Sequence, residues 1–130
     1  MKVQAELGGD PAQVARARSL VADALATWGV EREHREVTVL LVSELVTNAL
    51  LHSRPPYLLR AWREGPRVRV EMGDADPDAW PAIRPTRPDV PGGRGLRLVD
   101  TLASDWGTER DARSKRVWFE VAVSEETKIG

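Results

Sequence analysis

The sequence predicts an α+β fold, a two-layer α/β sandwich with helices on one face of a mostly antiparallel, mixed sheet. The chain has 130 residues, which suits one domain with one hydrophobic core. Apolar residues recur at helical spacing in some stretches and alternate in others, as in amphipathic helices and half-buried strands. No internal repeat or linker interrupts this pattern. We therefore expect a single domain over residues 1–123 and a flexible tail over residues 124–130.

A strand and two helices are expected in the first half of the chain. Residues 2–7 alternate between apolar and polar side chains, which predicts a strand. Asp10 and Pro11 are typical of a helix start, as N-cap and first helical residue, and Gly29 is a suitable end for that helix. A second helix is expected over residues 31–51, where a Pro-Pro segment soon follows.

The second half predicts four strands, a short helix and one long segment without periodicity. In the short helix, Leu96, Val99 and Leu102 recur at helical spacing and are expected to face the core. Residues 75–94 hold five prolines, and a loop of that length inside a small domain usually has a function. The expected strands cover residues 57–63, 67–74, 105–109 and 116–123, and the short helix covers residues 95–103.

Composition argues against several functional classes. The chain has no cysteine, which excludes disulfides, thiolate nucleophiles and cysteine-ligated metals. Nineteen basic and twenty acidic residues give a net charge of −1, so nucleic acid is not an expected partner. The longest apolar run, Val39 to Val42, is far shorter than the roughly 20 residues of a membrane helix. Because no leader peptide is visible, we expect a cytoplasmic protein.

The second predicted helix carries a narrow polar stripe between apolar faces. The stripe consists of Ser43, Glu44, Thr47, Asn48 and His52. One interpretation is an ordinary solvent face. Most solvent faces carry long charged side chains, however, whereas Glu44 and Asn48 place one carboxylate and one carboxamide on the same side of the helix. The second interpretation is therefore magnesium and base chemistry, since oxygen atoms of this kind suit both.

Two features of the second half fit either a binding site or ordinary loop structure. Residues 92–95 contain three glycines directly before the short helix, which gives free amides at a helix N-terminus and a suitable anion site. Glycines at such a position also serve as loop hinges. Asp74 ends a strand where the long segment begins, and it is either a binding residue or the cap of a turn.

Together, these elements resemble the GHKL superfamily of ATPases and kinases, which share the Bergerat ATP-binding fold. The closest resemblance is to stand-alone anti-sigma-factor serine/threonine kinases of the actinobacterial kind. Residues 44–49 (ELVTNA) resemble the N box, residues 70–74 (VEMGD) the first glycine box, and residues 93–99 (GRGLRLV) the second. The resemblance covers nearly the whole chain and identifies residues 75–95 as the ATP lid.

The resemblance implies a role for each motif residue. Glu44 would be the general base toward the attacking hydroxyl, and Asn48 would hold magnesium against the ATP triphosphate. Asp74 would accept a hydrogen bond from the adenine amino group. The residues implied at the phosphates, through backbone amides and through the charge of an arginine, are Gly93, Arg94, Gly95, Leu96 and Arg97.

Two departures from the family pattern concern the adenine end of the site. Residues 75–78 (ADPD) replace the glycines that usually follow the aspartate. On the last strand the family usually has Gly-x-Thr, whose hydroxyl supports the adenine-binding aspartate, and this chain has Ser114-Lys115-Arg116. We therefore expect Arg116 in place of the small hydroxyl, and weaker recognition of adenine.

Two functions follow from the resemblance. The first is an ATP-dependent protein serine/threonine kinase that phosphorylates a STAS-type anti-anti-sigma protein and also sequesters a sigma factor. The second is a binding module of the same fold that acts by partner capture without phosphotransfer. Glu44 and Asn48 favour the kinase, whereas Arg116 and the altered loop favour the module. The sequence does not decide between a monomer and a homodimer.

Overall fold

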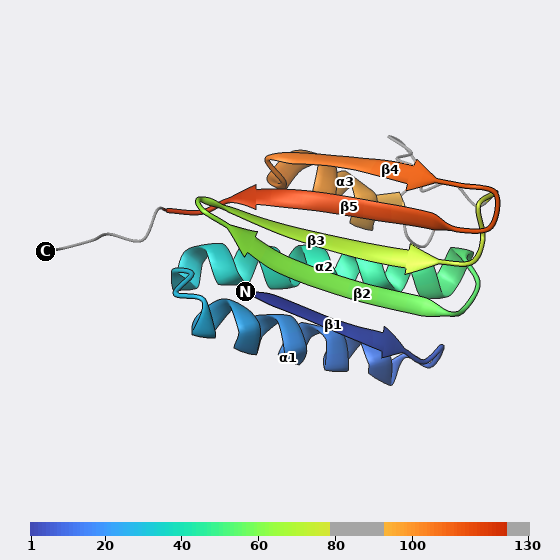
Figure 1. Ribbon diagram of the computed structural model, residues 1–130, viewed down its shortest axis with the longest axis horizontal. Coiled ribbons are helices and arrows are strands. Elements are labelled where there is room, and N and C mark those ends of the chain that lie inside the picture. The colour runs from blue at the N-terminus through green and yellow to red at the C-terminus, as the bar shows by residue number, and fades with distance from the viewer. Residues whose placement is uncertain (79–92, 125–130) are drawn as a thin grey trace, which may run out of the picture.

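The computed structural model describes the backbone of residues 1–78 and 93–124, and the side chains of residues 1–78 and 97–124. Within these ranges it confirms the predicted two-layer arrangement of helices and strands (Figure 1). The elements in chain order are β1 (Lys2–Leu7), α1 (Ala12–Thr27), α2 (Arg32–His52), β2 (Tyr57–Glu64), β3 (Arg67–Asp74), α3 (Gly93–Leu102), β4 (Asp105–Arg110) and β5 (Lys115–Ala122).

The strands form one sheet in the order β1-β2-β3-β5-β4. Each pairing in the described part of the sheet is antiparallel, so the sheet is more regular there than the mixed sheet that we expected. β3 lies at the centre, and β5 is inserted between β3 and β4. In the register of β3 with β5, Asp74 lies opposite Lys115 and Arg69 lies opposite Glu120.

All three helices lie behind the sheet in Figure 1, so one sheet face is covered and the other is open. Alternate residues of each strand point toward the helices and form the core with them. Those of β3 and β5, as the alternation predicted, are the buried Val68, Val70, Met72, Val117, Phe119 and Val121. The core is therefore built from the inner sheet face, and the open face carries the intervening residues.

The ends of α1 agree with the sequence signals to within one residue. Asp10 precedes the helix by two residues, and its carboxylate accepts a hydrogen bond from the Ala12 backbone N at 3.0 Å. At the other end, Gly29 has a φ of +74°, which favours glycine. Val30 then begins a short connection to α2, so the two helices pack as antiparallel neighbours.

The short helix α3 differs from the prediction at its start and on its inner face. It begins at Gly93 rather than residue 95. Val99 is fully buried as expected, but Leu102 is 41% exposed, so the prediction that Leu102 faces the core is wrong. The inner face follows Val99 and its i+4 neighbour Ala103, with Leu98 beside them. The side chain of Leu96 lies outside the described residues.

Other predictions also fall outside the described residues. The lid assigned to residues 75–95 lies outside them except for residues 75–78 and the first turn of α3, and the tail lies outside them beyond Ser124. In the part that the structure does describe, no helix is long and apolar enough to cross a membrane.

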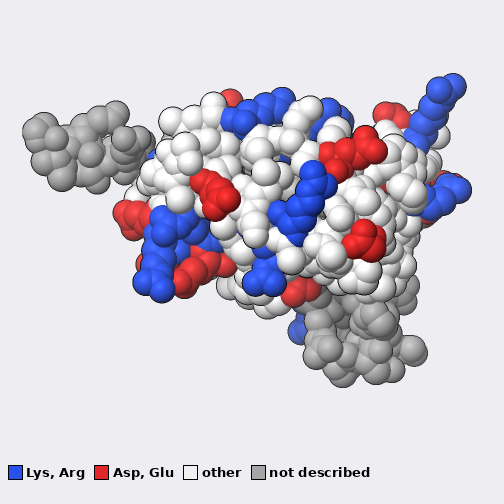
Figure 2. Space-filling view, turned by 90° about the horizontal axis from the view of Figure 1, so that it is seen from below, with Lys and Arg blue, Asp and Glu red and all other residues white. Residues whose placement is uncertain are grey.

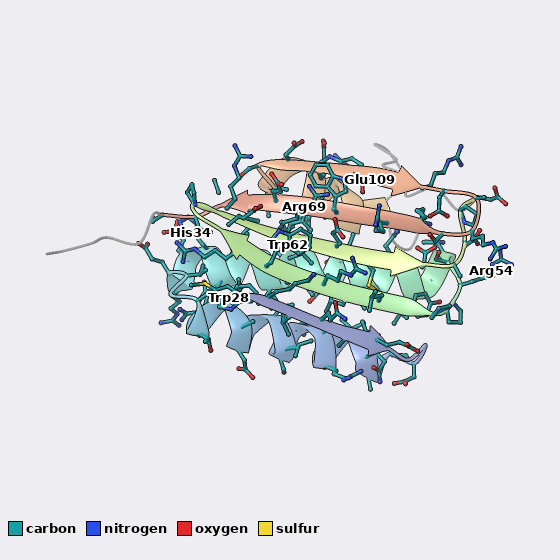
Figure 3. All side chains as sticks on the ribbon, viewed as in Figure 1. Trp28, His34, Arg54, Trp62, Arg69 and Glu109 are labelled. Atoms are coloured by element: carbon teal, nitrogen blue, oxygen red, sulfur yellow. The ribbon has the colours of Figure 1, made fainter. Side chains whose placement is uncertain are left out.

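The open sheet face carries a stack of aromatic and charged side chains near its centre (Figure 3). The guanidinium carbon of Arg69 lies 4.0 Å from the ring centroid of Trp118 and 5.8 Å from that of Trp62. Arg69 also donates hydrogen bonds to Glu71 at 3.0 Å and to Glu120 at 3.3 Å. Gly107 lies opposite Trp118 and leaves room for its ring, because a Cβ there would be 2.8 Å from Cζ2.

Candidate functional site

The polar stripe of α2 is not a solvent-exposed face. Asn48 is buried, with 8% of its surface exposed, and Ser43, Glu44 and Thr47 are half-buried. Only His52, in the last turn, is exposed. Ser43 donates a hydrogen bond to the carbonyl oxygen of Val39 at 3.2 Å, so its hydroxyl is used within the helix. A stripe with this burial differs from the ordinary solvent face that was one interpretation of the sequence.

Glu44 and Asn48 lack partners among the residues that the structure describes. Neither side chain makes a hydrogen bond or ion pair with any of them. In the described part of the chain, the only buried side-chain nitrogen or oxygen atom without a hydrogen-bond partner is Nε of Arg60, so the amide atoms of Asn48 keep some contact with solvent. One turn of helix separates the two residues, so their oxygen atoms lie along the same side of α2. Within the described part of the chain, these oxygen atoms are therefore available to a ligand on this side of the helix.

The packing of α2 fixes the direction in which this pair points. The apolar side chains around it are fully or almost fully buried against α1, α3 and the inner sheet face, and they are Leu41, Val42, Leu45, Val46 and Ala49. A helix held on so many sides has little freedom to rotate. Glu44 and Asn48 are thus presented by a rigid element, which is what a binding or catalytic site needs.

Asp74 lies at the end of β3 on the inner face of the sheet, where 5% of its surface is exposed. Its Oδ1 accepts a hydrogen bond from the backbone N of Asp76 at 2.8 Å. Its Oδ2 lies 3.4 Å from Nζ of Lys115, which is buried as well. Nζ of Lys115 also lies 3.4 Å from Oγ of Ser53, directly after α2. The candidate adenine residue is therefore part of a buried ion pair.

The prediction that Arg116 replaces the family's hydroxyl beside Asp74 is wrong. Arg116 points to the open face, where its Nη2 lies 3.1 Å from Oε1 of Glu109 (labelled in Figure 3). Lys115 is the residue that faces Asp74. The sequence contained the signal for this assignment: since Val117 and Phe119 point inward, the same alternation places Lys115 inside and Arg116 outside.

Short contacts join the end of α2 to the end of β3. The backbone N of Ala75 donates a hydrogen bond to the carbonyl oxygen of Arg54 at 3.0 Å, and Nε of Arg54 lies 3.5 Å from Oδ2 of Asp76. These contacts place the segment after β3 beside the C-terminus of α2. The predicted site residues Asn48 and Asp74 therefore belong to elements that meet at one end of the molecule.

The chain's single tyrosine lies next to this junction. Tyr57 is buried, and its hydroxyl donates a hydrogen bond to the carbonyl oxygen of Ser53 at 3.1 Å. Burial raises the pKa of Tyr57 above its ordinary value of 10.0, and the negative charge of Asp74 raises this pKa further. The phenol is thus a nearby reporter of the charge on Asp74.

The remaining predicted residues lie in the first turns of α3. Gly93, Arg94, Gly95 and Leu96 form the start of the helix, where backbone amides have no intrahelical acceptor. Such amides can bind a phosphate group. The side chains of these residues lie outside the described part, and Arg97 is exposed. Because α3 packs against α2, this helix start belongs to the same helical layer as Glu44 and Asn48.

Comparison with known protein families gives a match. A model of the family described as the histidine kinase-like ATPase domain matches residues 7–121. No curated protein matches the chain.

Two solved structures share the fold. The RsbU and RsbW domains of Rv1364c from Mycobacterium tuberculosis are 18% identical, with a TM-score of 0.74 over 100% of this chain and 34% of that one. The histidine kinase domain of the Erythrobacter litoralis EL346 blue-light activated histidine kinase is 22% identical, with a TM-score of 0.52 over 87% of this chain and 60% of that one. The chain thus spans about a third of the first structure and three fifths of the second.

The family match covers β2 to β4, nearly all of β5, the three helices and the positions of Glu44, Asn48, Asp74 and Gly93, but only the last residue of β1. It confirms the GHKL resemblance that the sequence motifs predicted, and the structural likenesses independently support the fold. The chain belongs to the histidine kinase-like ATPase domain family.

Proposed function

We propose that this chain is an ATP-binding regulator of the anti-sigma type that acts as a protein serine/threonine kinase. Its proposed substrate is a STAS-type anti-anti-sigma protein, and it also captures a sigma factor. Membership of an ATPase-domain family supports the use of ATP. The likeness to a structure that contains an RsbW domain supports the anti-sigma part of the proposal. The proposed location is the cytoplasm, where such partners would be found.

The observation that carries this proposal is the pair of oxygen-bearing side chains on α2. Asn48 is buried without a hydrogen-bond partner among the described residues, so its carbonyl oxygen fits a hard cation. In the described part of the chain, no group of three or more His, Cys, Asp or Glu side chains could hold a metal ion. Magnesium would therefore rely on Asn48 and on ATP phosphates, and when bound it would neutralise phosphate charge.

The proposed general base is Glu44, and its position and exposure support this role. It lies one turn before Asn48 and is half-buried, so a partner's hydroxyl can reach it from solvent. In the proposed reaction, Glu44 accepts the proton of a serine or threonine hydroxyl on the partner. The hydroxyl oxygen bonds to the γ-phosphorus of ATP, and the bond from that phosphorus to the β–γ bridging oxygen breaks, which releases ADP. The amides at the start of α3 bind and orient the phosphates.

A binding module without phosphotransfer is the second candidate function. The observation that favours it is the buried pair of Asp74 and Lys115, which weakens the case for strong adenine binding. Binding of nucleic acid has less support. The face shown in Figure 2 mixes acidic and basic side chains and has no large basic patch, in keeping with the net charge of −1.

Two substitutions on α2 test the kinase proposal, because loss of the base and loss of the magnesium ligand should have different effects. Glu44→Gln keeps the shape of the side chain but removes the base, so phosphotransfer to a STAS-type protein should fall by roughly 10² to 10⁴ while ATP binding persists. Asn48→Ala removes a magnesium ligand, so ATP affinity should fall and depend less on magnesium. Radiolabelled phosphotransfer and calorimetry measure the two effects.

Glu33→Gln is the matched control, because Glu33 is an exposed carboxylate of the same helix. It should leave both phosphotransfer and ATP binding unchanged. If Glu44→Gln and Asn48→Ala also behave like the parent and change only the melting temperature, the polar stripe has no catalytic role and the kinase proposal is wrong. Binding of ATP by the parent without phosphotransfer would favour the binding module.

A further inference from the structure

We propose that Lys115 is a specificity-determining residue that competes with adenine for the carboxylate of Asp74. The chain then binds ATP weakly and discriminates little between a base with the adenine amino group and a base without it. This inference rests on the proposed ATP-binding function, and it concerns a residue that the family pattern alone would not identify. It follows from the contacts of Asp74, from the burial of the pair and from the size and charge of Lys115.

Each carboxylate oxygen of Asp74 already has a partner in the structure. Oδ1 accepts a hydrogen bond from the Asp76 backbone, and Oδ2 lies 3.4 Å from the ammonium of Lys115. A carboxylate oxygen can accept more than one hydrogen bond, so the adenine amino group is not excluded by number alone. It would nevertheless share Oδ2 with a full positive charge, and a neutral N–H is the weaker of the two partners.

Burial strengthens the attachment of Lys115 to Asp74. The side chains of Lys115 and Asp74 are 4% and 2% exposed, so little water screens their attraction. Displacing the ammonium would leave a buried carboxylate without its counter-charge, which is strongly unfavourable. Ser53 holds the same ammonium from the end of α2. The pair should therefore persist when a nucleotide approaches, and the base should gain little from Asp74.

The family's usual residue would act differently at this position. A small neutral hydroxyl can donate one hydrogen bond to the carboxylate and leaves its negative charge available to the adenine amino group. The long ammonium of Lys115 instead neutralises that charge and fills space beside it. Lys115→Thr restores the small hydroxyl, and Lys115→Arg is the matched control that keeps the cation.

Calorimetry on the full chain can test this proposal with two nucleotides in the presence of magnesium. One is ATP, and the other is purine riboside triphosphate, which differs only in lacking the amino group. The parent and Lys115→Arg should bind the two within about threefold of each other. In Lys115→Thr, the affinity for ATP should rise by about tenfold or more, while the affinity for the analogue changes little. Circular dichroism confirms that each variant is folded.

The outcomes separate this inference from the proposed function. If the parent binds ATP and Lys115→Thr binds it no better, the competition by Lys115 is wrong while ATP binding stands. If only Lys115→Thr binds ATP, the competition is supported and the kinase function of the parent fails. If neither binds at millimolar concentration, both proposals are wrong. Should Lys115→Thr not fold, a parent that prefers ATP over the analogue by about tenfold overturns the inference, and a parent without preference supports it.

Discussion

Lys115 and Arg116 are adjacent cations of β5 that lie on opposite faces of the sheet. Lys115 points inward and pairs with Asp74, where the two side chains are 4% and 2% exposed. Arg116 points outward and pairs with Glu109, where the exposed fractions are 50% and 49%. Between these limits, Arg69 on the open face pairs with Glu71 at 22% and 9%. Ion pairs thus occur in three environments, and their exposure to water determines how much each one contributes to the stability of the fold.

The inner pair should show the largest effect on stability. Lys115→Met leaves the carboxylate of Asp74 buried without its counter-charge, so the free energy of unfolding should fall by roughly 3–5 kcal/mol. Adding Asp74→Asn removes the uncompensated charge and should recover much of that loss. Urea unfolding measures both. If Lys115→Met is as stable as the parent, the inner pair does not differ from the surface pairs and the comparison breaks down.

The stack on the open face should show an intermediate effect. Arg69→Ala removes two hydrogen-bonded carboxylate contacts and the packing on Trp118, which should lower the free energy of unfolding by roughly 1–2 kcal/mol. Arg69→Lys keeps the charge but not the planar group that lies against the ring, so it should recover only part of the loss. A loss from Arg69→Ala larger than that from Lys115→Met would reverse the proposed order.

The half-exposed pair should contribute least. Arg116→Ala should change the free energy of unfolding by at most about 1 kcal/mol, because water solvates both charged groups well without the contact. Added salt should reduce even this difference, since salt screens exposed charges. The same urea experiment at low and high ionic strength checks both statements. A loss near that of Lys115→Met would show that exposure is not the deciding variable.

Titration of the Tyr57 phenol reports on the charge of Asp74 in the inner ion pair. Because its pKa is raised in the folded state, the unfolded chain loses the phenolic proton first, and stability falls as pH rises above about 10. Asp74→Asn removes the negative charge but not the burial, so the pKa of Tyr57 should move part of the way back. Absorbance of tyrosinate reports this one residue, because the chain has a single tyrosine. An unchanged titration would mean that the charge of Asp74 does not reach the phenol.

Local periodicity predicted most of the fold because each element has a one-sided apolar pattern. The alternation in β3 and β5 placed Val70 and Phe119 on the inner face, where the structure has them. Leu102 was assigned to the wrong face of α3, because a ten-residue helix has too few turns for periodicity to distinguish between neighbouring faces. Glu44 and Asn48 were found together because their spacing on one helix is local information.

The partner of Asp74 was harder to predict because it depends on strand pairing. Residues 75–114 lie between Asp74 and Lys115, and only the register of β3 with β5 brings the two together. Motif alignment placed Arg116 there, one residue away, and a shift of one residue exchanges the two sheet faces. The alternation of side chains along β5 would have placed Lys115 rather than Arg116 on the inner face. The contact between Lys115 and Asp74, however, can be predicted only when the strand order is known.

The seam between β3 and β5 joins two hairpins, β2 with β3 and β4 with β5, and its alignment is specified by charge as well as by apolar packing. Arg69 opposes Glu120 on one face, and Asp74 opposes Lys115 on the other. Sliding β5 by two residues would keep the apolar face inside but would place Asp74 opposite Val117 or beyond the strand. Both opposite-charge contacts would be lost together, and a carboxylate would be buried alone. The two pairs thus specify the strand alignment, so the contact that we propose to compete with adenine also favours the correct joining of the two hairpins.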